Sequence, residues 1–306
     1  MRTLFNPDRM MRIAQYMILT RVLERVDIPD YIHAFERGRS IPEMAQQHTG
    51  KGLVISLDLK DFFTSIKQRH LKQIFEHLGV GEAPARTLSE ICTYQSFVPQ
   101  GGLTSPKVSN IVSSLTFGPV LKRYCDENNL TLSIYADDIT ISCNEVPSGQ
   151  EGNAAVGAII SRVTEVVTSF GFRINRAKTK IMRPHQRQYV CGVVVNERTN
   201  LQQRERRRLR AIVHNCLVNG IQAECQKSGV SAETFISQIT GRINWFSQLN
   251  QEKGSDMMEN FRRAIDSYRE SVVSDTSSAD VQTITETSPA EEVNMPVEVP
   301  WETEEN

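Results

Sequence analysis

The residues best suited to chemistry in this chain are two adjacent aspartates, Asp137 and Asp138. They lie in the segment 133–142, where apolar and polar residues alternate, so we expect a tight turn between two short β-strands. Two neighbouring carboxylates repel each other, and a divalent cation is the usual compensation. A third carboxylate, Asp58, follows the apolar run 54–57, which predicts a buried strand.

Carboxylates presented by strands suit Mg²⁺, which binds hard oxygen ligands and keeps positions for water and substrate phosphates. Two such ions about 4 Å apart stabilise the in-line displacement of nucleotidyl transfer. We therefore assign Asp58 and Asp137 as ligands that bridge two Mg²⁺ ions, with Asp138 supporting the site and Mn²⁺ as an alternative metal. The prediction is a nucleotide polymerase. An isolated Asp-Asp pair is more often a structural turn, because Asp favours turns.

Four further sequence blocks accompany the aspartate pair. Their order favours a catalytic pair over a purely structural turn. They are Asp58–Phe63, Val98–Pro106, Gly171–Lys180 and Tyr189–Val195. This order and spacing resemble the palm of reverse transcriptases. Within that group, Asp-Leu-Lys-Asp-Phe-Phe, Pro-Gln-Gly and Thr-Ser-Pro resemble the bacterial retron reverse transcriptases.

Two retron hallmarks are present in altered form. The family's Asn-Ala-x-x-His element reads Met-Ala-Gln-Gln-His at 44–48, and its Val-Thr-Gly element reads Val-Cys-Gly at 190–192. The resemblance extends over residues 1 to about 270. The change from Val-Thr-Gly to Val-Cys-Gly puts the specificity for the template RNA in doubt, but not catalysis.

The resemblance implies an α+β right-hand polymerase fold. Fingers and palm, an antiparallel sheet with helices, would occupy residues 1–196, and a helical thumb 197–273. Residues 274–306 contain three prolines and no helical period, which predicts an acidic, disordered tail. The segment 1–7 resembles the second strand of a fingers hairpin, which implies either that the first strand lies upstream of this chain or that the fingers are reduced.

Local patterns predict the remaining elements. Helices are expected at 8–26, 67–79, 82–95, from Thr104 onward, and at 153–169, 203–218, 231–249 and 254–271. A strand is expected at 175–182 and a short hairpin at 190–195. The first helix is predicted to be amphipathic, with the apolar residues Met11, Ile13, Tyr16, Met17, Leu19, Leu23 and Val26.

The resemblance also implies a nucleotide-binding set. Its members are Arg2, Asp61, Phe62, Phe63, Gln100 and Lys178. Arg2 would hold the triphosphate, which the backbone at Asp61 and Phe62 would also face. Phe63 would stack under the sugar and exclude a 2′-hydroxyl, although core packing is the alternative. Gln100 would contact the nucleotide, and Lys178 would neutralise or protonate pyrophosphate unless it is a solvated surface lysine.

A second set is implied to contact primer, template or RNA. Tyr135 would touch the primer terminus, and Gly192 belongs to the altered Val-Cys-Gly element. Arg204, Arg207 and Arg208 fall on one side of a predicted helix, where they would bind an A-form backbone or form a solvated face. His48 is an RNA-contact candidate through the retron element alone, because a lone histidine is more often structural.

Charge and cysteine content bear on partners and location. The net charge of −1 includes nine acidic residues in 274–306, which leaves 27 acidic against 35 basic residues in the rest of the chain. An excess of eight basic residues suits a nucleic-acid ligand, although an ordinary solvated surface is the alternative.

The six cysteines form no Cys-x-x-Cys pair, so we expect reduced thiols in a cytoplasmic protein without a zinc site. No membrane span or signal peptide is predicted.

The expected function is RNA-directed DNA synthesis on a cognate structured non-coding RNA, as in retron-type anti-phage defence. Expected partners are the structured RNA template and primer, the RNA–DNA hybrid, dNTPs and a toxin or effector protein. One alternative is another prokaryotic reverse transcriptase, from a defence or CRISPR-linked locus. Another is a non-catalytic RNA-binding scaffold on the same fold, which the intact aspartates oppose and the missing fingers strand favours.

Overall fold

A computed structural model describes residues 4–145 and 149–281, with side chains as far as Val273. Two compact units make up the chain: Met1–Leu209 with Gly241–Ser255, and Arg210–Thr240 with the chain from Asp256 onward. The expected boundaries of fingers and palm, thumb and tail, at residues 196 and 273, stay predictions. Arg2 lies outside the described residues.

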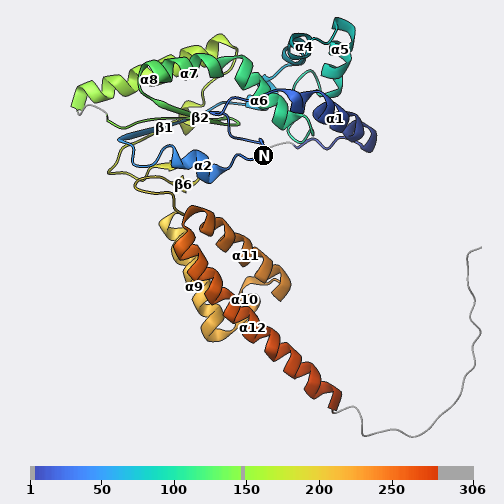
Figure 1. The fold of residues 1–306 in the computed structure, drawn as a ribbon, viewed down its shortest axis with the longest axis vertical. Coiled ribbons are helices and arrows are strands. Elements are labelled where there is room, and N and C mark those ends of the chain that lie inside the picture. Colours follow the sequence, from blue (N-terminus) through green and yellow to red (C-terminus); the bar gives the residue numbers. More distant parts are fainter. Residues whose placement is uncertain (1–3, 146–148, 282–306) are drawn as a thin grey trace, which may run out of the picture. The chain divides into compact units, whose positions relative to one another are not determined.

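The first unit is built on a four-stranded sheet in the order β2-β3-β1-β4 (Figure 1). Its strands are β1 Leu53–Asp58, β2 Thr131–Tyr135, β3 Asp138–Cys143 and β4 Lys180–Met182. Every pairing is antiparallel. A separate hairpin consists of β5 Tyr189–Val190 and β6 Val193–Val194, as expected from the sequence. The predicted α+β class with an antiparallel sheet is therefore confirmed.

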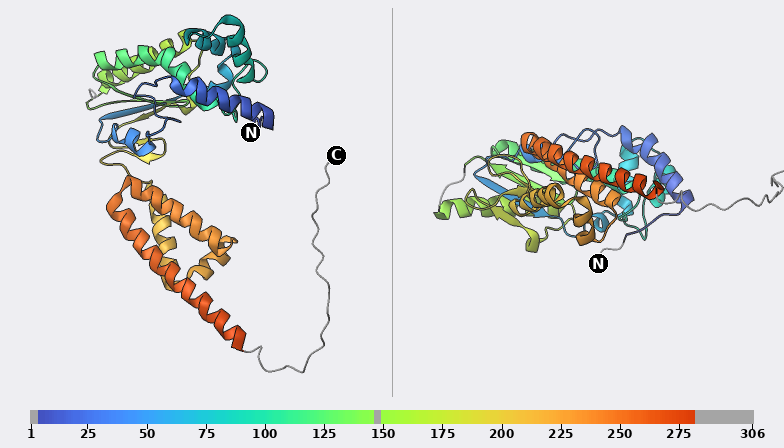
Figure 2. Two further views of the ribbon diagram at one scale, coloured as in Figure 1. Left: turned by 45° about the vertical axis from the view of Figure 1, so that its right-hand side comes forward. Right: turned by 90° about the horizontal axis from the view of Figure 1, so that it is seen from below.

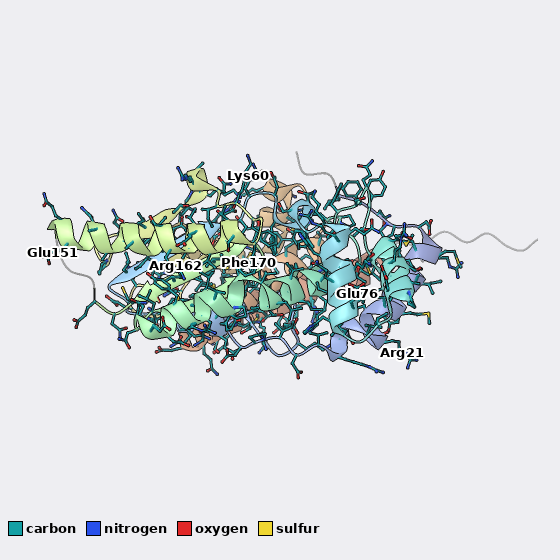
Figure 3. All side chains as sticks on the ribbon, turned by 90° about the horizontal axis from the view of Figure 1, so that it is seen from above. Arg21, Lys60, Glu76, Glu151, Arg162 and Phe170 are labelled. Atoms are coloured by element: carbon teal, nitrogen blue, oxygen red, sulfur yellow. The ribbon has the colours of Figure 1, made fainter. Side chains whose placement is uncertain are left out.

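Helices cover one face of this sheet (Figure 1). They are α6 Ser105–Leu115, α7 Phe117–Glu127 and α8 Gly149–Ser169. Figure 3 shows α8 from outside, with Glu151 and Arg162 along it and Phe170 just beyond its end. Beneath these helices, the rings of Phe62, Phe117 and Phe172 lie 5.5–6.5 Å apart and are at most 3 % exposed. This aromatic cluster is central to the core of the unit.

The remaining elements of the first unit are short helices. They are α1 Arg9–Arg21, η1 Leu23–Arg25, α2 Ile41–Gln46, α3 Phe62–Ser65, α4 Gln68–His77, α5 Glu82–Ile91 and η2 Arg176–Lys178. The predicted helices at 67–79 and 82–95 correspond to α4 and α5. The strand predicted at 175–182 is wrong in its first half, because the 3₁₀ turn η2 precedes a β4 of only three residues.

The predicted apolar face of α1 is also largely wrong. Tyr16 and Met17 are 58 % exposed, whereas Gln15 is 3 % exposed. The buried Gln15 amide donates to the Ile91 carbonyl at 2.9 Å and accepts from the Leu103 amide at 3.0 Å. A polar side chain that satisfies two backbone groups can therefore occupy the packed face, and hydropathy alone does not identify such a residue.

His48 follows α2 and joins it to the sheet. Its side chain is completely buried, with Nδ1 2.7 Å from Ser142 Oγ and Nε2 2.9 Å from Ser133 Oγ. Burial, followed by the charges of Lys51 and His33, lowers its pKa to about 3. The expectation that His48 contacts RNA is therefore not supported, because a buried neutral ring between two strands has no surface to offer.

Lowering the pH should destabilise the fold through the buried, neutral His48 side chain. Its pKa in the folded protein lies below the ordinary 6.5, so the unfolded chain takes up the proton first, and stability falls as the pH drops from 6.5 towards 3. For one such group the slope is about 1.4 kcal/mol per pH unit. Urea unfolding between pH 7 and 5 should show this extra slope in the wild type, and His48→Gln should lack it. The exposed His185→Gln serves as the control; equal slopes in all three proteins would contradict the assignment.

The second unit is helical wherever it is described (Figure 2). The C-terminal helices are α9 Gln203–Asn219, α10 Ile221–Ser228, α11 Ala232–Leu249 and α12 Gln251–Val281, of which α9, α11 and α12 run across the unit boundaries. Residues 274–281, expected to be disordered, belong to α12; residues 282–306 lie outside the described part. Over the described residues, no helix is both long and apolar enough to cross a membrane.

Candidate active site

Strand pairing brings the three predicted aspartates to one end of the sheet. Asp58 ends β1 and is the register partner of Asp138, the first residue of β3. Asp137 lies in the tight turn between β2 and β3, where Ala136 has a φ of 53°. The Leu59 amide donates to the Asp137 carbonyl at 2.7 Å, which ties this turn to the end of β1. The hairpin predicted from the sequence is confirmed.

Negative charge accumulates at this end of the sheet. Burial, followed by the charges of Asp137 and Asp58, raises the pKa of Asp138 to about 6, and Lys178 and Lys180 oppose the shift only in part. Such mutual repulsion is what a cation relieves, and carboxylate oxygens are the donors that Mg²⁺ and Mn²⁺ bind. The residues present therefore fit a divalent metal ion.

Asp58 has two side-chain partners. Its Oδ1 accepts from Lys178 Nζ at 2.5 Å, and its Oδ2 accepts from Asn175 Nδ2 at 3.1 Å. The backbone N–H of Asn175 also donates to the backbone carbonyl of Asp58 at 2.7 Å. In this arrangement no three His, Cys, Asp or Glu side chains of the described residues form a ready-made metal cluster. An ionised carboxylate has about four lone-pair sites, so Asp58 keeps acceptor positions beside these two partners.

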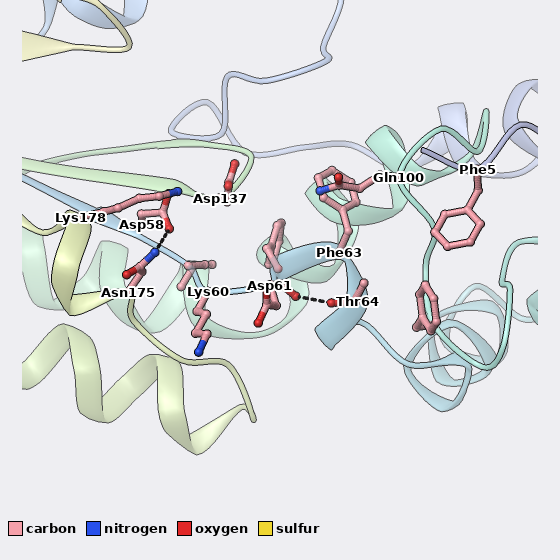
Figure 4. Close-up of a pocket in the computed structure, with 13 residues that line it drawn as sticks. Phe5, Asp58, Lys60, Asp61, Phe63, Thr64, Gln100, Asp137, Asn175 and Lys178 are labelled. Carbon is pink, nitrogen blue, oxygen red and sulfur yellow. Dashed lines mark hydrogen bonds and ion pairs between the residues drawn. The ribbon is translucent and has the colours of Figure 1, made fainter. Parts of the chain in front are cut away.

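A pocket of about 420 Å³ opens beside these aspartates (Figure 4). Its lining includes the following predicted residues: Asp58, Asp61, Phe62, Phe63, Gln100, Asp137 and Lys178. Residues of four blocks that are distant in the sequence thus share one cavity. Asp138 does not line it, and Arg2 cannot be assessed because it lies outside the described residues.

The floor of the pocket is set by the start of α3. Asp61 has a φ of 51°, and its carbonyl accepts from Thr64 Oγ1 at 3.0 Å and from Ser65 Oγ at 2.8 Å. Phe62 is 3 % exposed and belongs to the aromatic core, so only its backbone can face a ligand. Phe63 is half-buried, and its ring reaches the pocket beside Gln100 (Figure 4). Phe63 therefore combines core packing with an exposed ring edge.

Phe5 is a pocket residue that sequence reasoning missed. Its amide donates to the Gln100 carbonyl at 2.8 Å, and its ring lies 4.9 Å from that of Tyr94 and 5.9 Å from that of Phe97. Gly101 has a φ of 111°, and a Cβ there would lie 2.2 Å from the Phe5 carbonyl oxygen. A glycine after Pro-Gln is thus needed because Phe5 approaches so closely.

The predicted primer and RNA contacts lie outside this pocket. Tyr135 ends β2 and is half-buried. Gly192 is exposed in the β5–β6 turn with a φ of 84°. Burial, then the charges of Asp138 and Asp137, raise the pKa of its neighbour Cys191 to about 12, so this turn lies near the aspartates. The predicted RNA contacts Arg204, Arg207 and Arg208 are exposed on α9.

Comparison with known proteins agrees with this geometry. The family model described as "Reverse transcriptase (RNA-dependent DNA polymerase)" matches residues 1–209. The retron Ec86 reverse transcriptase of Escherichia coli is 29 % identical over 217 residues, covering 70 % of this chain and 65 % of its own length. The retron Mx162 reverse transcriptase of Myxococcus xanthus is 32 % identical over 241 residues, covering 70 % of this chain and 50 % of its own.

This chain therefore spans about half to two thirds of the length of these relatives. Among solved structures, telomerase from Candida albicans in complex with a fragment of telomeric RNA matches with a TM-score of 0.47 at 11 % identity, covering 91 % of this chain and 59 % of that one. The predicted resemblance to retron reverse transcriptases is confirmed by the sequence relatives. The chain belongs to the reverse transcriptase (RNA-dependent DNA polymerase) family.

Proposed function

We propose that this protein is an RNA-directed DNA polymerase that extends a primer with dNTPs on an RNA template. One observation carries the proposal: Asp58 and Asp137 line the same 420 Å³ pocket as Phe63, Gln100 and Lys178. The pocket is thus lined by two carboxylates that can bind a metal ion, by an aromatic ring, by a side-chain amide and by a lysine ammonium group. That combination suits a nucleoside triphosphate, which has a sugar, a base and a charged phosphate chain.

The three aspartates would hold two divalent ions, Mg²⁺ or Mn²⁺, with Asp58 and Asp137 as the main ligands and Asp138 in support. When bound, these ions supply charge stabilisation to the phosphates and a lower pKa to the attacking hydroxyl. Asn175 restricts the Asp58 carboxylate through its hydrogen bond. Lys178, half-exposed at the pocket, is placed to neutralise or protonate the departing pyrophosphate.

Replacing both turn aspartates, Asp137→Ala with Asp138→Ala, tests this function. DNA synthesis on a primed RNA template should fall to background, a loss of at least about 1,000-fold, because the charge stabilisation at the reacting phosphate is lost. RNA affinity should change less than threefold, since it depends on basic residues elsewhere. Primer extension and filter binding with Mg²⁺ give the two measurements.

The matched control is Asp126→Ala, which removes a surface carboxylate paired with Lys122 on α7 and should leave synthesis unchanged. Robust extension by the double variant would refute the metal-ligand assignment. Failure of the wild type to extend any primer would instead favour the non-catalytic RNA-binding scaffold.

Phe63 is proposed to select the sugar. A ring at the pocket edge leaves no room for a 2′-hydroxyl, so Phe63→Val should raise rNTP incorporation relative to dNTP by about 10- to 100-fold, the value of one removed steric clash. Single-nucleotide extension with each substrate gives the ratio. Phe97→Leu, a change in another aromatic that lines the pocket, serves as the comparison. If folded Phe63→Val discriminates between rNTP and dNTP as the wild type does, Phe63 serves only in packing.

The exposed arginines of α9 are proposed to bind the RNA backbone. Replacing Arg204, Arg207 and Arg208 together with Gln should weaken RNA binding and reduce the slope of log affinity against log salt by about 2 to 3 units, one per phosphate contact. Arg206→Gln, on the other side of the same helix, is the control. An unchanged slope in the triple variant would identify this face as merely solvated.

We further propose that the template is a cognate structured RNA, as expected for a retron-type defence protein. The support is the 29–32 % identity to retron reverse transcriptases. Purifying the protein from its native host and sequencing the nucleic acid bound to it tests this proposal. A single abundant RNA, joined to complementary DNA, is the expected result; a random sample of cellular RNA would oppose it.

A further inference from the structure

Three aromatic rings form a cluster at one end of the nucleotide pocket, where Phe5 lies across the cavity from Asp58 (Figure 4). The ring centroids of Phe5 and Tyr94 are 4.9 Å apart, those of Phe5 and Phe97 are 5.9 Å apart, and those of Tyr94 and Phe97 are 6.3 Å apart. Phe5 and Phe97 line the pocket, whereas Tyr94 lies outside its lining and is 48 % exposed. The aromatic wall of the pocket therefore continues onto an exposed surface.

A tight turn fixes the position of Tyr94. The backbone N–H groups of Tyr94 and Phe97 each donate to the other residue's carbonyl, at 2.9 and 3.0 Å. Gln95 and Ser96 between them have φ values of 48° and 64°, and two left-handed residues in succession are typical of a two-residue hairpin turn. The backbone N–H of Gln68 donates to the Ser96 carbonyl at 3.0 Å, so the start of α4 holds this turn. The Tyr94 ring is thus presented on a fixed backbone.

A positive charge lies beside this aromatic cluster. Lys67, the residue before α4, is exposed, and its Nζ lies 5.8 Å from the centroid of the Phe97 ring. Aromatic rings beside a cation suit single-stranded nucleic acid, because bases stack on the rings and the cation neutralises a backbone phosphate. The surface therefore fits a nucleotide whose base is unpaired.

The position of the cluster shows which unpaired nucleotide it can reach. Bases of the copied duplex are stacked between neighbouring base pairs, whereas the template ahead of the templating base is single-stranded and its bases can be turned outward. The backbone N–H of Phe5 donates to the carbonyl of Gln100, which lines the pocket, and the Phe5 ring contacts that of Tyr94. The path from the pocket to Tyr94 is thus one residue long. The template nucleotide next to the nascent base pair would meet the Tyr94 ring.

We propose that Tyr94 stacks on the base of the first uncopied nucleotide of the RNA template, the one directly ahead of the templating base. The proposal rests on the polymerase function proposed above. Phe5 and Phe97 support the Tyr94 ring from the pocket side, and Lys67 binds a phosphate of the same strand. Held in this way, the uncopied base stays off the nascent base pair, so that only the templating base faces the incoming dNTP.

The test uses two primed RNA templates that differ at one uncopied position. The nucleotide directly ahead of the templating base is normal in one template and a stable abasic analogue in the other. Addition of a single nucleotide is measured, so the altered position is never copied and no base pair is lost. With the normal template, Tyr94→Ala and Tyr94→Leu should each lose about tenfold in kcat/KM for primer–template, as expected for one lost stacking contact. With the abasic template, the wild type should lose a similar factor and the variants little more.

Three controls accompany this comparison. Tyr94→Phe keeps the ring and should match the wild type on both templates. Tyr16→Ala, which removes an exposed ring on α1, should also behave as the wild type does. An abasic analogue placed further ahead in the template should leave the wild type unaffected. Tyr94→Leu retains apolar volume against Phe5 and Phe97, so it separates loss of stacking from loss of packing.

If the Tyr94 variants lose the same factor on both templates, or lose nothing, the ring does not contact the uncopied base and the proposal is wrong. Those outcomes leave the polymerase function intact, because the wild type still extends the primer. A wild type that extends the primer on neither template would refute the polymerase function itself.

Discussion

The cross-strand register between β1 and β3 is the constraint on which the candidate site depends. Asp58 and Asp138 are paired residues of these strands, and Leu57 pairs with Ile139 directly behind them. Side chains alternate between the faces of a strand, so a shift of one residue would send the carboxylates of the two strands to opposite faces. The side chains of β3 oppose that shift, because the apolar Ile139 and Ile141 would have to exchange faces with the polar Thr140 and Ser142, and all four are buried.

Backbone strain is concentrated around the same site. Seven non-glycine residues of the described chain have a positive φ, and four of them surround the aspartates: Phe35, Asp61, Ala136 and Cys191. Each such conformation costs about 1–2 kcal/mol. Together with the repulsion among the aspartates, this is a considerable fraction of the 5–15 kcal/mol that a typical domain has available. The site can exist only because the aromatic core and the paired strands determine the backbone on every side.

What the sequence could predict follows from how local each feature is. The aspartate hairpin, β1, α4 and α5 are encoded by short-range alternation, helical periodicity and turn residues, and they were predicted. The buried face of α1 was not, because Gln15 is packed through hydrogen bonds to Ile91 and Leu103, which are distant in sequence. The same holds for the close approach of Phe5 to Gly101. The glycine was recognisable in the sequence, but its partner was not.

The buried groups that fix the loop before α2 illustrate this limit most clearly. Glu36, Lys107 and Asn110 read as ordinary polar residues in the sequence, and nothing in their spacing links a loop to a helix seventy residues away. Their value is conditional: an unpaired buried charge would strongly destabilise the fold, whereas the pair with its amide partner fixes one loop conformation. Apolar residues that filled the same volume could stabilise the fold as well or better. The contacts of this polar network fix the backbone on both sides of Phe35, through Glu36 and the Ala34 carbonyl.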